Sequence, residues 1–181
     1  MVETILLALF LAKLRGYKIK PLFKDWPIYL VGAFALSYIA LEVAVFRGNY
    51  SLVKYANIYK GMYIAVFIGM VIKYNLNKSA IVGSIFAFIG SALNNIAITS
   101  NGGKMPVFPS TSYLTGYVNV DTFSKVNDIH ILGSNLVNNK ILTDVIDLGY
   151  TILSLGDVFI RVLPFLLVFY AVKSQNEKVI S

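Results

Sequence analysis

Ionisable and amide side chains stand at or near the ends of several long apolar runs in this sequence. Asn94 and Asn95 close one run, Asp157 and Arg161 open another, and Glu42 lies near the end of a third. Carboxylates and amides of this kind can bind a polar ligand. Two carboxylates that share one proton can also activate water for hydrolysis. The first question is therefore which elements bring these side chains together.

The composition places the chain in a membrane. Of the 181 residues, 57% are hydrophobic and 14% are charged, whereas soluble domains carry roughly 25% charged residues. A soluble protein of this length cannot cover so much apolar surface, but lipid can surround it. The net charge is +7, and the basic residues flank apolar runs. They indicate orientation in a lipid bilayer, so we expect no nucleic-acid partner.

The residue types that usually bind metals are scarce. The chain has no cysteine and one histidine. Disulfides, thiol catalysis and cysteine-ligated metal sites are therefore excluded, and a histidine-cluster metal site is not expected. The aspartates of the later sequence lack the spacing of a calcium-binding loop. We expect neither a metal ion nor a cofactor.

Five apolar runs predict an all-α fold, an integral membrane bundle of four to five transmembrane helices. A helix over the first run would cover only roughly 20 Å, against ~30 Å for a hydrocarbon core, so whether it spans stays open. Trp26 and Tyr29, at the start of the second run, are typical of the membrane interface. Residues 1–181 are expected to form a single transmembrane domain. Its helices are expected at 2–14, 28–46, 56–72, 79–98 and 155–172.

Positive charge predicts the orientation of these helices. Nine of the sixteen lysines and arginines lie between the first and second runs, between the third and fourth, or after the fifth. Cytoplasmic loops are enriched in such residues. We therefore expect the N-terminus outside and the C-terminus in the cytoplasm.

Residues 100–154 form the long connection, which this orientation places outside. A structureless loop of such length is unusual in a compact domain, so we expect it to be partly helical. Its start, "NGGKMPVFP", predicts a turn because Asn-Gly-Gly permits positive φ and the prolines stop a helix. His130 lies in this loop, where a lone histidine is more often a surface or turn residue than a functional one.

Small residues recur at packing intervals in two of the expected helices. Such stripes let helix backbones approach closely in lipid. Packing inside the bundle is the favoured interpretation, and an interface between copies of the chain is the alternative. The stripes are Gly61, Ala65 and Gly69, and then Gly83, Ala87, Gly90 and Ser91.

The polar side chains are expected at one depth, as a band under the outer loop. The functional interpretation is a pocket open to the outer surface, because ionisable groups within a membrane often mark sites. A structural interpretation competes with it. Ser154 and Asp157 fit a capping box, Asp157 and Arg161 can pair along one helix face, and Glu42 can pair with Lys60 or Arg161.

The motif "NGGKMPV", followed by a histidine, "LTDVID" and "SLGDVFI", resembles an uncharacterised family of small bacterial multi-pass membrane proteins, a domain of unknown function. The resemblance covers nearly the whole chain. It implies a location in the bacterial cytoplasmic membrane and brings no activity with it. Its marks in this sequence are Asn101, Gly102, Gly103, Met105, Pro106, His130, Asp144, Ser154, Gly156 and Asp157.

A fainter resemblance concerns lipoprotein signal peptidase, a membrane aspartyl protease. "GSALNNIAI" and "DVIDLGYTILSLGDVFIRVL" are similar to its second half, and Asp157 matches one of its two catalytic aspartates by position. Residues 96–98, Ile-Ala-Ile, occupy the place of the other. The catalytic chemistry would therefore need Asp144, Asp147 or Glu42 as a substitute.

These observations lead to one main hypothesis and one rival. The main hypothesis is a non-enzymatic membrane protein that binds a lipid or small ligand, or serves other membrane proteins as an accessory subunit. The rival is a membrane hydrolase that uses Asp157 and Asp144. A transporter or channel is disfavoured because the inner halves of the helices carry almost no ionisable groups. The predicted binding residues are Glu42, Asn94, Asn95, Asn101, His130, Asp157 and Arg161.

Overall fold

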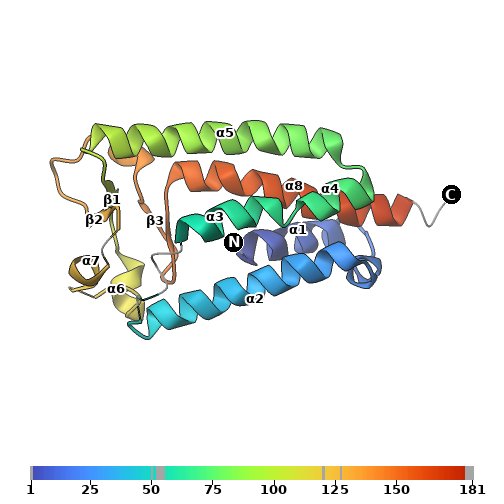
Figure 1. Cartoon of the computed structure of the whole chain (residues 1–181), viewed down its shortest axis with the longest axis horizontal. Helices are drawn as coiled ribbons and strands as arrows, with labels where there is room; N and C mark the ends of the chain where they lie inside the picture. The colour runs from blue at the N-terminus through green and yellow to red at the C-terminus, as the bar shows by residue number, and fades with distance from the viewer. Residues whose placement is uncertain (1, 50, 52–55, 120, 127, 178–181) are drawn as a thin grey trace. The chain divides into compact units, whose positions relative to one another are not determined.

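The computed structural model of the chain describes residues 2–49, 51, 56–119, 121–126 and 128–177 and is mostly helical (Figure 1). Within these residues three helices are long and apolar enough to cross a membrane: α2 (Trp26–Phe46), α5 (Asn77–Ser100) and α8 (Leu155–Glu177). The chain divides into two compact units. Unit 1 comprises Met1–Ile39, Asn57–Phe86 and Arg161–Ser181, and unit 2 comprises Ala40–Ala56 and Ala87–Ile160.

Unit 1 contains short helices beside its parts of the long ones. The first helix, α1 (Val2–Leu14), has the predicted bounds, and a short 3-10 helix, η1 (Lys20–Lys24), precedes α2. The core of this unit is apolar and fully buried. It includes Leu22 of η1, Phe67 and Met70 of the third apolar run, and Val168 and Val172 of α8.

The third apolar run corrects a prediction. One helix was expected over 56–72, but the structure has α3 (Ala56–Ala65) and α4 (Ile68–Tyr74), separated by a turn at Val66 and Phe67. At this turn the hydrogen bonds tighten, because the amide of Phe67 donates to Ile64 and that of Met70 to Phe67, three residues back. The expected four to five spanning helices are thus three long helices and a shorter apolar stretch, Gly61–Tyr74.

Unit 2 contains the connection between α5 and α8, which we call the cap and define as Asn101–Ser154. Its helical elements are α6 (Thr111–Thr115), α7 (Thr122–Lys125) and η3 (Lys140–Leu142). The expectation of an all-α chain was incomplete, because the cap also has four short strands. β1 (Met105–Val107) pairs in parallel with β2 (His130–Leu132), and β3 (Ile146–Asp147) pairs antiparallel with β4 (Ile152–Leu153).

Proline explains why the first of these segments is extended. Pro106 lies inside β1 and Pro109 follows it, so neither position can donate the backbone hydrogen bond of a helix. The strand is instead held on its second side by Asp144. The Asp144 amide donates to Pro106 O at 3.1 Å, and the Phe108 amide donates to Asp144 O at 2.9 Å. Three distant segments of the cap therefore meet at β1.

Glycines let α5 and α8 approach closely. Within unit 1, a Cβ on Gly83 would lie 2.8 Å from the Leu163 Cα, and within unit 2, a Cβ on Gly90 would lie 2.4 Å from the Gly156 carbonyl oxygen. These distances confirm that Gly83 and Gly90 of the α5 stripe pack against α8, whereas Ser91 of the same stripe is exposed. The other predicted stripe differs, because Gly61 and Ala65 are exposed and only Gly69 meets another helix, at the Trp26 ring.

Substitution of Gly90 tests this packing. We expect Gly90→Ala to destabilise the protein by about 1–3 kcal/mol, because the added methyl group cannot fit against the Gly156 carbonyl. Gly61→Ala is the matched control, since nothing lies within 4 Å of its new Cβ. It should be neutral or stabilising by up to about 1 kcal/mol through helix propensity. Thermal unfolding in detergent measures both, and equal melting temperatures for the two variants would contradict close packing at Gly90.

Candidate functional site

The first polar cluster joins α5 to the start of α8. Asn94 Nδ2 donates to Asp157 Oδ1 at 3.0 Å, and Ser154 Oγ donates to Asn94 Oδ1 at 2.7 Å. The Asp157 amide donates to Ser154 Oγ at 2.9 Å, and the Ser154 amide donates to Asp157 Oδ2 at 3.3 Å. The last two bonds confirm the predicted capping box. These four bonds begin α8 and hold it against α5.

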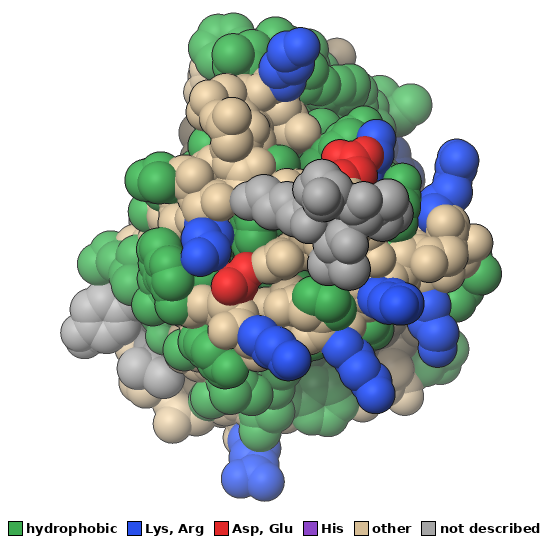
Figure 2. All heavy atoms as spheres, turned by 90° about the vertical axis from the view of Figure 1, so that its right-hand side faces the viewer, with side chains coloured by type: hydrophobic (Ala, Val, Ile, Leu, Met, Phe, Trp, Pro, Cys, Tyr) green, Lys and Arg blue, Asp and Glu red, His purple; other side chains and the backbone are tan. Residues whose placement is uncertain are grey.

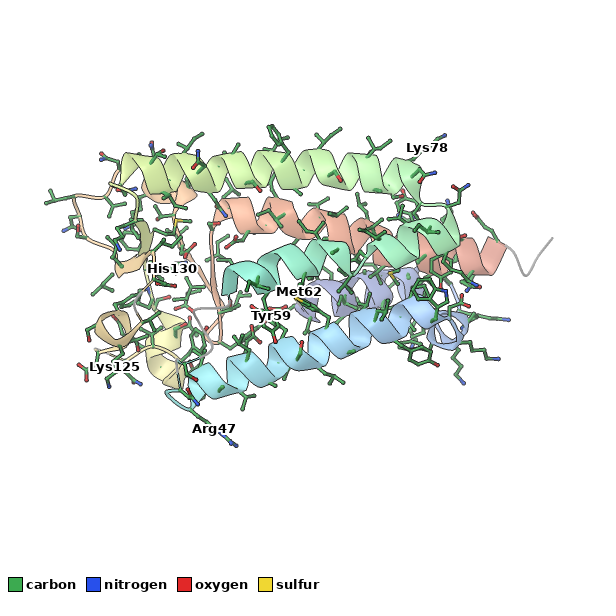
Figure 3. All side chains as sticks on the ribbon, in the orientation of Figure 1. Arg47, Tyr59, Met62, Lys78, Lys125 and His130 are labelled. Carbon is green, nitrogen blue, oxygen red and sulfur yellow. The ribbon has the colours of Figure 1, made fainter. Side chains whose placement is uncertain are left out.

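A second cluster surrounds His130 inside the cap (Figure 3). The His130 Nδ1 atom lies 2.6 Å from Asp128 Oδ2, and its Nε2 atom lies 3.6 Å from Asp144 Oδ2. The Asp144 side chain is 6% exposed, and the His130 ring is 33% exposed. Asp128 also accepts a bond from the His130 amide at 2.8 Å. A protonated His130 can therefore pair with two carboxylates and hold β2 beside the segment that carries Asp144.

The third cluster centres on Asp147, which the sequence analysis named only as a substitute for a catalytic aspartate. Its carboxylate accepts bonds from the amides of Ser110 at 2.6 Å, Ser112 at 2.8 Å and Gly149 at 2.8 Å. It also accepts a bond from Ser112 Oγ at 2.5 Å. Burial raises the pKa of Asp147, but these hydrogen bonds outweigh burial and lower the pKa to about 2. Asp147 therefore fixes the start of α6 as an ionised carboxylate.

Asn101, a residue of the "NGGKMPV" motif, forms an amide clamp with Asn138. Asn101 Nδ2 donates to Asn138 O at 2.9 Å, and the Asn138 amide donates to Asn101 Oδ1 at 2.9 Å. Asn138 Nδ2 also donates to Ser100 O at 3.0 Å. The clamp ties the end of α5 to a loop 37 residues further along the chain. The hydrogen bonds of the Asn101 side chain therefore stabilise the fold of the cap.

Arg161 has a different partner from those predicted. Its Nη1 atom lies 3.5 Å from Glu3 Oε1 in unit 1, and both side chains are largely buried. The expected pair of Asp157 and Arg161 is therefore wrong, because Asp157 turns to Asn94 while Arg161 pairs with α1. The pairing of Glu42 with Lys60 or Arg161 stays a prediction, and the side chain of Lys60 lies outside the described residues.

Other expected members of the polar band lie apart from these clusters. Asn95 is exposed and Glu42 is half-buried, and the side chain of Asn57 lies outside the described residues. A cavity of about 10 Å³ lies in unit 1, with walls that are apolar and aromatic (Val2, Ile5, Val31, Phe34, Ala35, Tyr38, Tyr63, Val66 and Phe67). It is not the polar pocket that the sequence predicts, and that pocket stays a prediction.

The chemistry of the arrangement follows from the partners of each carboxylate. Among the described residues, Asp157 is bonded to amide, hydroxyl and backbone groups, and no second carboxylate takes part. Asp144 belongs to the His130 cluster instead. An aspartyl dyad needs two carboxylates that share one proton. The geometry therefore gives Asp157 and Asp144 separate surroundings, each suited to holding the cap together.

Substitution of Asp147 tests the role of these clusters. Because its pKa of about 2 lies below the unfolded value of 3.8, the carboxylate stabilises the cap above about pH 4, and this contribution is lost as the pH falls toward 2. We expect Asp147→Asn to destabilise the cap by about 1 kcal/mol at neutral pH, a figure reduced for solvent screening of a partly exposed group. Hydrogen exchange at the amides of Ser110 and Ser112 measures the effect.

The matched control is Asp121→Asn, which removes an exposed cap carboxylate whose partner is Lys125 at 3.6 Å. Its exchange rates at Ser110 and Ser112 should stay at the wild-type values. Unchanged protection of those amides in Asp147→Asn between about pH 2 and 7 would show that the carboxylate does not hold α6.

Comparison with known families matches residues 20–169 to a model described as a family of unknown function, DUF5317. The match includes all the motif residues from Asn101 to Asp157. No protein of curated function and no solved structure matches the chain, so the likeness to lipoprotein signal peptidase gains no support. The chain, with its three apolar helices and its hydrogen-bonded cap, belongs to the DUF5317 family of unknown function.

Proposed function

We propose that the chain is a non-enzymatic accessory subunit of the bacterial cytoplasmic membrane, which presents its cap to another membrane protein on the outer side. In this arrangement α2, α5 and α8 cross the bilayer, and α3 and α4 together make a fourth, interrupted crossing. With α1 as a further, short crossing, the N-terminus faces outside and the C-terminus faces the cytoplasm; four crossings without α1 would instead leave both termini in the cytoplasm.

The distribution of charge supports this orientation. Over its whole sequence, unit 1 carries eleven lysines and arginines against three acidic residues, a net charge of +8. Unit 2 carries five basic and six acidic residues, a net charge of −1. Positive charge is retained on the cytoplasmic side of membrane proteins. Unit 1 contains the first turns of α2 and the last turns of α8, so those ends are assigned to the cytoplasm.

The proposal depends on one observation: the side chains that could do chemistry are already bonded to other groups of the protein. Asp157, His130 and Asp147 are each engaged with groups of the cap or of the helices that it joins. Large apolar side chains of the cap are meanwhile left in solvent. Leu136 is 91% exposed, Leu114 is 88% exposed and Ile141 is 73% exposed. Exposed apolar side chains on a well-fixed scaffold favour protein binding over catalysis.

The rival hydrolase finds less support. The carboxylate of Asp157 accepts bonds from Asn94 and from the Ser154 amide. A dyad would require a second carboxylate close enough to share a proton with it. Asp144 is directed at His130 instead. A structural role for Asp157 is therefore the better explanation of its contacts.

Photo-crosslinking in living cells tests the proposal. A photoreactive amino acid at Leu136 or Ile141 should give a discrete adduct with another membrane protein. The same amino acid at Phe88, which is 77% exposed on α5, should give lipid adducts only. We further expect Leu136→Asp to abolish co-purification of the captured protein while the chain remains in the membrane, because a charge at the centre of an apolar contact is costly.

The neighbouring substitution Asn135→Asp is the matched control, since it adds the same charge at another exposed position of the loop. It should leave the captured protein bound. Two results would contradict the proposal: loss of the partner in both variants, or hydrolysis of a membrane lipid or lipoprotein by the purified chain that Asp157→Asn abolishes.

A further inference from the structure

The end of unit 1 that holds η1 presents a surface of basic side chains, which we call the basic face. Figure 2 shows Lys and Arg side chains gathered there among hydrophobic ones. Seven of its members are exposed, and Lys173 is half-buried. The exposed members are Lys13, Arg15, Lys18, Lys20, Lys24, Lys73 and Lys78.

Hydrogen bonds bring the segments of this face together. The Lys18 amide donates to Asn176 Oδ1 at 2.8 Å, and Asn176 Nδ2 donates to Lys18 O at 3.0 Å. Asp25 accepts a bond from Tyr74 Oη at 2.8 Å and another from Gln175 Nε2. The connector between α1 and α2, the end of α4 and the end of α8 therefore meet at one place.

Most of the positive charge on this face is not neutralised by the protein. Asp25 lies 3.8 Å from Lys73, and Glu177 lies 3.6 Å from Lys173. Within the described residues no ion pair includes any of the other six members: Lys13, Arg15, Lys18, Lys20, Lys24 and Lys78. Concentrated positive charge of this kind attracts an anionic partner.

The aromatic side chains beside the lysines indicate which anionic partner fits. Leu22 of η1 is fully buried, while Phe23 is 48% exposed. Trp26 and Tyr29, in the first turns of α2, are 51% and 63% exposed. Exposed aromatic rings at the end of an apolar helix are typical of the interface between lipid tails and headgroups. Lysines at that level meet the phosphates of the headgroups.

The connector is fixed before any partner binds. The backbone amide and the carbonyl oxygen of Lys18 both form hydrogen bonds with the Asn176 side chain. Asn176 Nδ2 also donates to Val172 O at 2.7 Å. Leu22 anchors η1 in the core, so Lys20, Phe23 and Lys24 are directed outward. Little conformational freedom of the backbone is then lost on binding, which favours affinity.

We propose that the basic face is a binding site for anionic phospholipid headgroups, with Lys18, Lys20 and Lys24 as its principal phosphate contacts. This inference does not depend on the proposed binding of the cap to another membrane protein. It requires only that this end of the apolar helices lies at a membrane surface. Basic clusters next to spanning helices bind anionic lipids by this combination of charge and position.

Native mass spectrometry of the full chain in neutral detergent tests the site, with phosphatidylglycerol as the anionic probe and phosphatidylcholine as the zwitterionic one. The wild-type chain should prefer phosphatidylglycerol and lose this preference at high salt. The triple variant Lys18→Gln, Lys20→Gln, Lys24→Gln should bind phosphatidylglycerol about a hundredfold more weakly, because each lysine near an anionic surface contributes roughly a factor of five.

Two control variants separate a site from general charge. Arg47→Gln, Lys104→Gln, Lys125→Gln removes the same charge from unit 2 and should change the affinity by less than about twofold. Replacing Lys18, Lys20 and Lys24 by arginine keeps the charge and should retain binding. Unchanged melting temperatures would show that all variants fold, as expected because the clamp to Asn176 uses the backbone of residue 18.

Four results would overturn the inference. They are equal affinity for the two lipids at low salt, equal loss of binding in both glutamine variants, displacement of the lipid by free glycerol phosphate, and tighter binding of a nucleic-acid duplex than of phosphatidylglycerol. The last two would assign the lysines to a soluble anion or to a nucleic acid.

Discussion

Lipid tails offer no hydrogen-bond partner, so each polar group near the membrane must find its partners inside the protein. Several polar side chains of α5 and α8 meet this requirement, whereas the buried Tyr63 hydroxyl has no hydrogen-bond partner among the described residues. Asn94, Ser154 and Asp157 bond to one another where α8 begins. Arg161, one turn further along α8, pairs with Glu3 of α1. Each of these contacts also joins α8 to another helix or begins α8, so the same bonds satisfy the polar groups and hold the helices together.

The cap extends this solution beyond the helix ends. Asn101 clamps Asn138, His130 lies between Asp128 and Asp144, and Asp147 holds the start of α6. Several of the residues that mark the resemblance therefore have contacts that hold the fold together: Asn101, His130, Asp144, Ser154 and Asp157. A residue pattern shared by a family can reflect the demands of a fixed cap as well as those of chemistry. Acidic and amide residues of such a pattern therefore do not by themselves indicate an enzyme.

Sequence reasoning succeeded where a local signal was strong. The bounds of α1 and the capping box at Ser154 follow from hydrophobic runs and from cap spacing. The break between α3 and α4 was missed because no glycine or proline marks Val66 and Phe67. The partner of Arg161 was missed because Glu3 lies 158 residues away in the sequence. In the sequence, nothing distinguishes Asp147 from Asp121, since both are aspartates of the same long loop. Only the fold shows that Asp147 accepts hydrogen bonds from three backbone amides while Asp121 is exposed to solvent.

Our central proposal is that lipid surrounds the long helices, that the cap faces the outside and that the basic face lies at the cytoplasmic surface. The chain has no native cysteine, so single cysteines can report on each position. A membrane-impermeant thiol reagent applied to whole cells should label Asn135→Cys, label Lys78→Cys only after the membrane is opened, and leave Phe88→Cys unlabelled in both conditions. Rapid labelling of Phe88→Cys, or labelling of Asn135→Cys and Lys78→Cys from the same side, would contradict the claim.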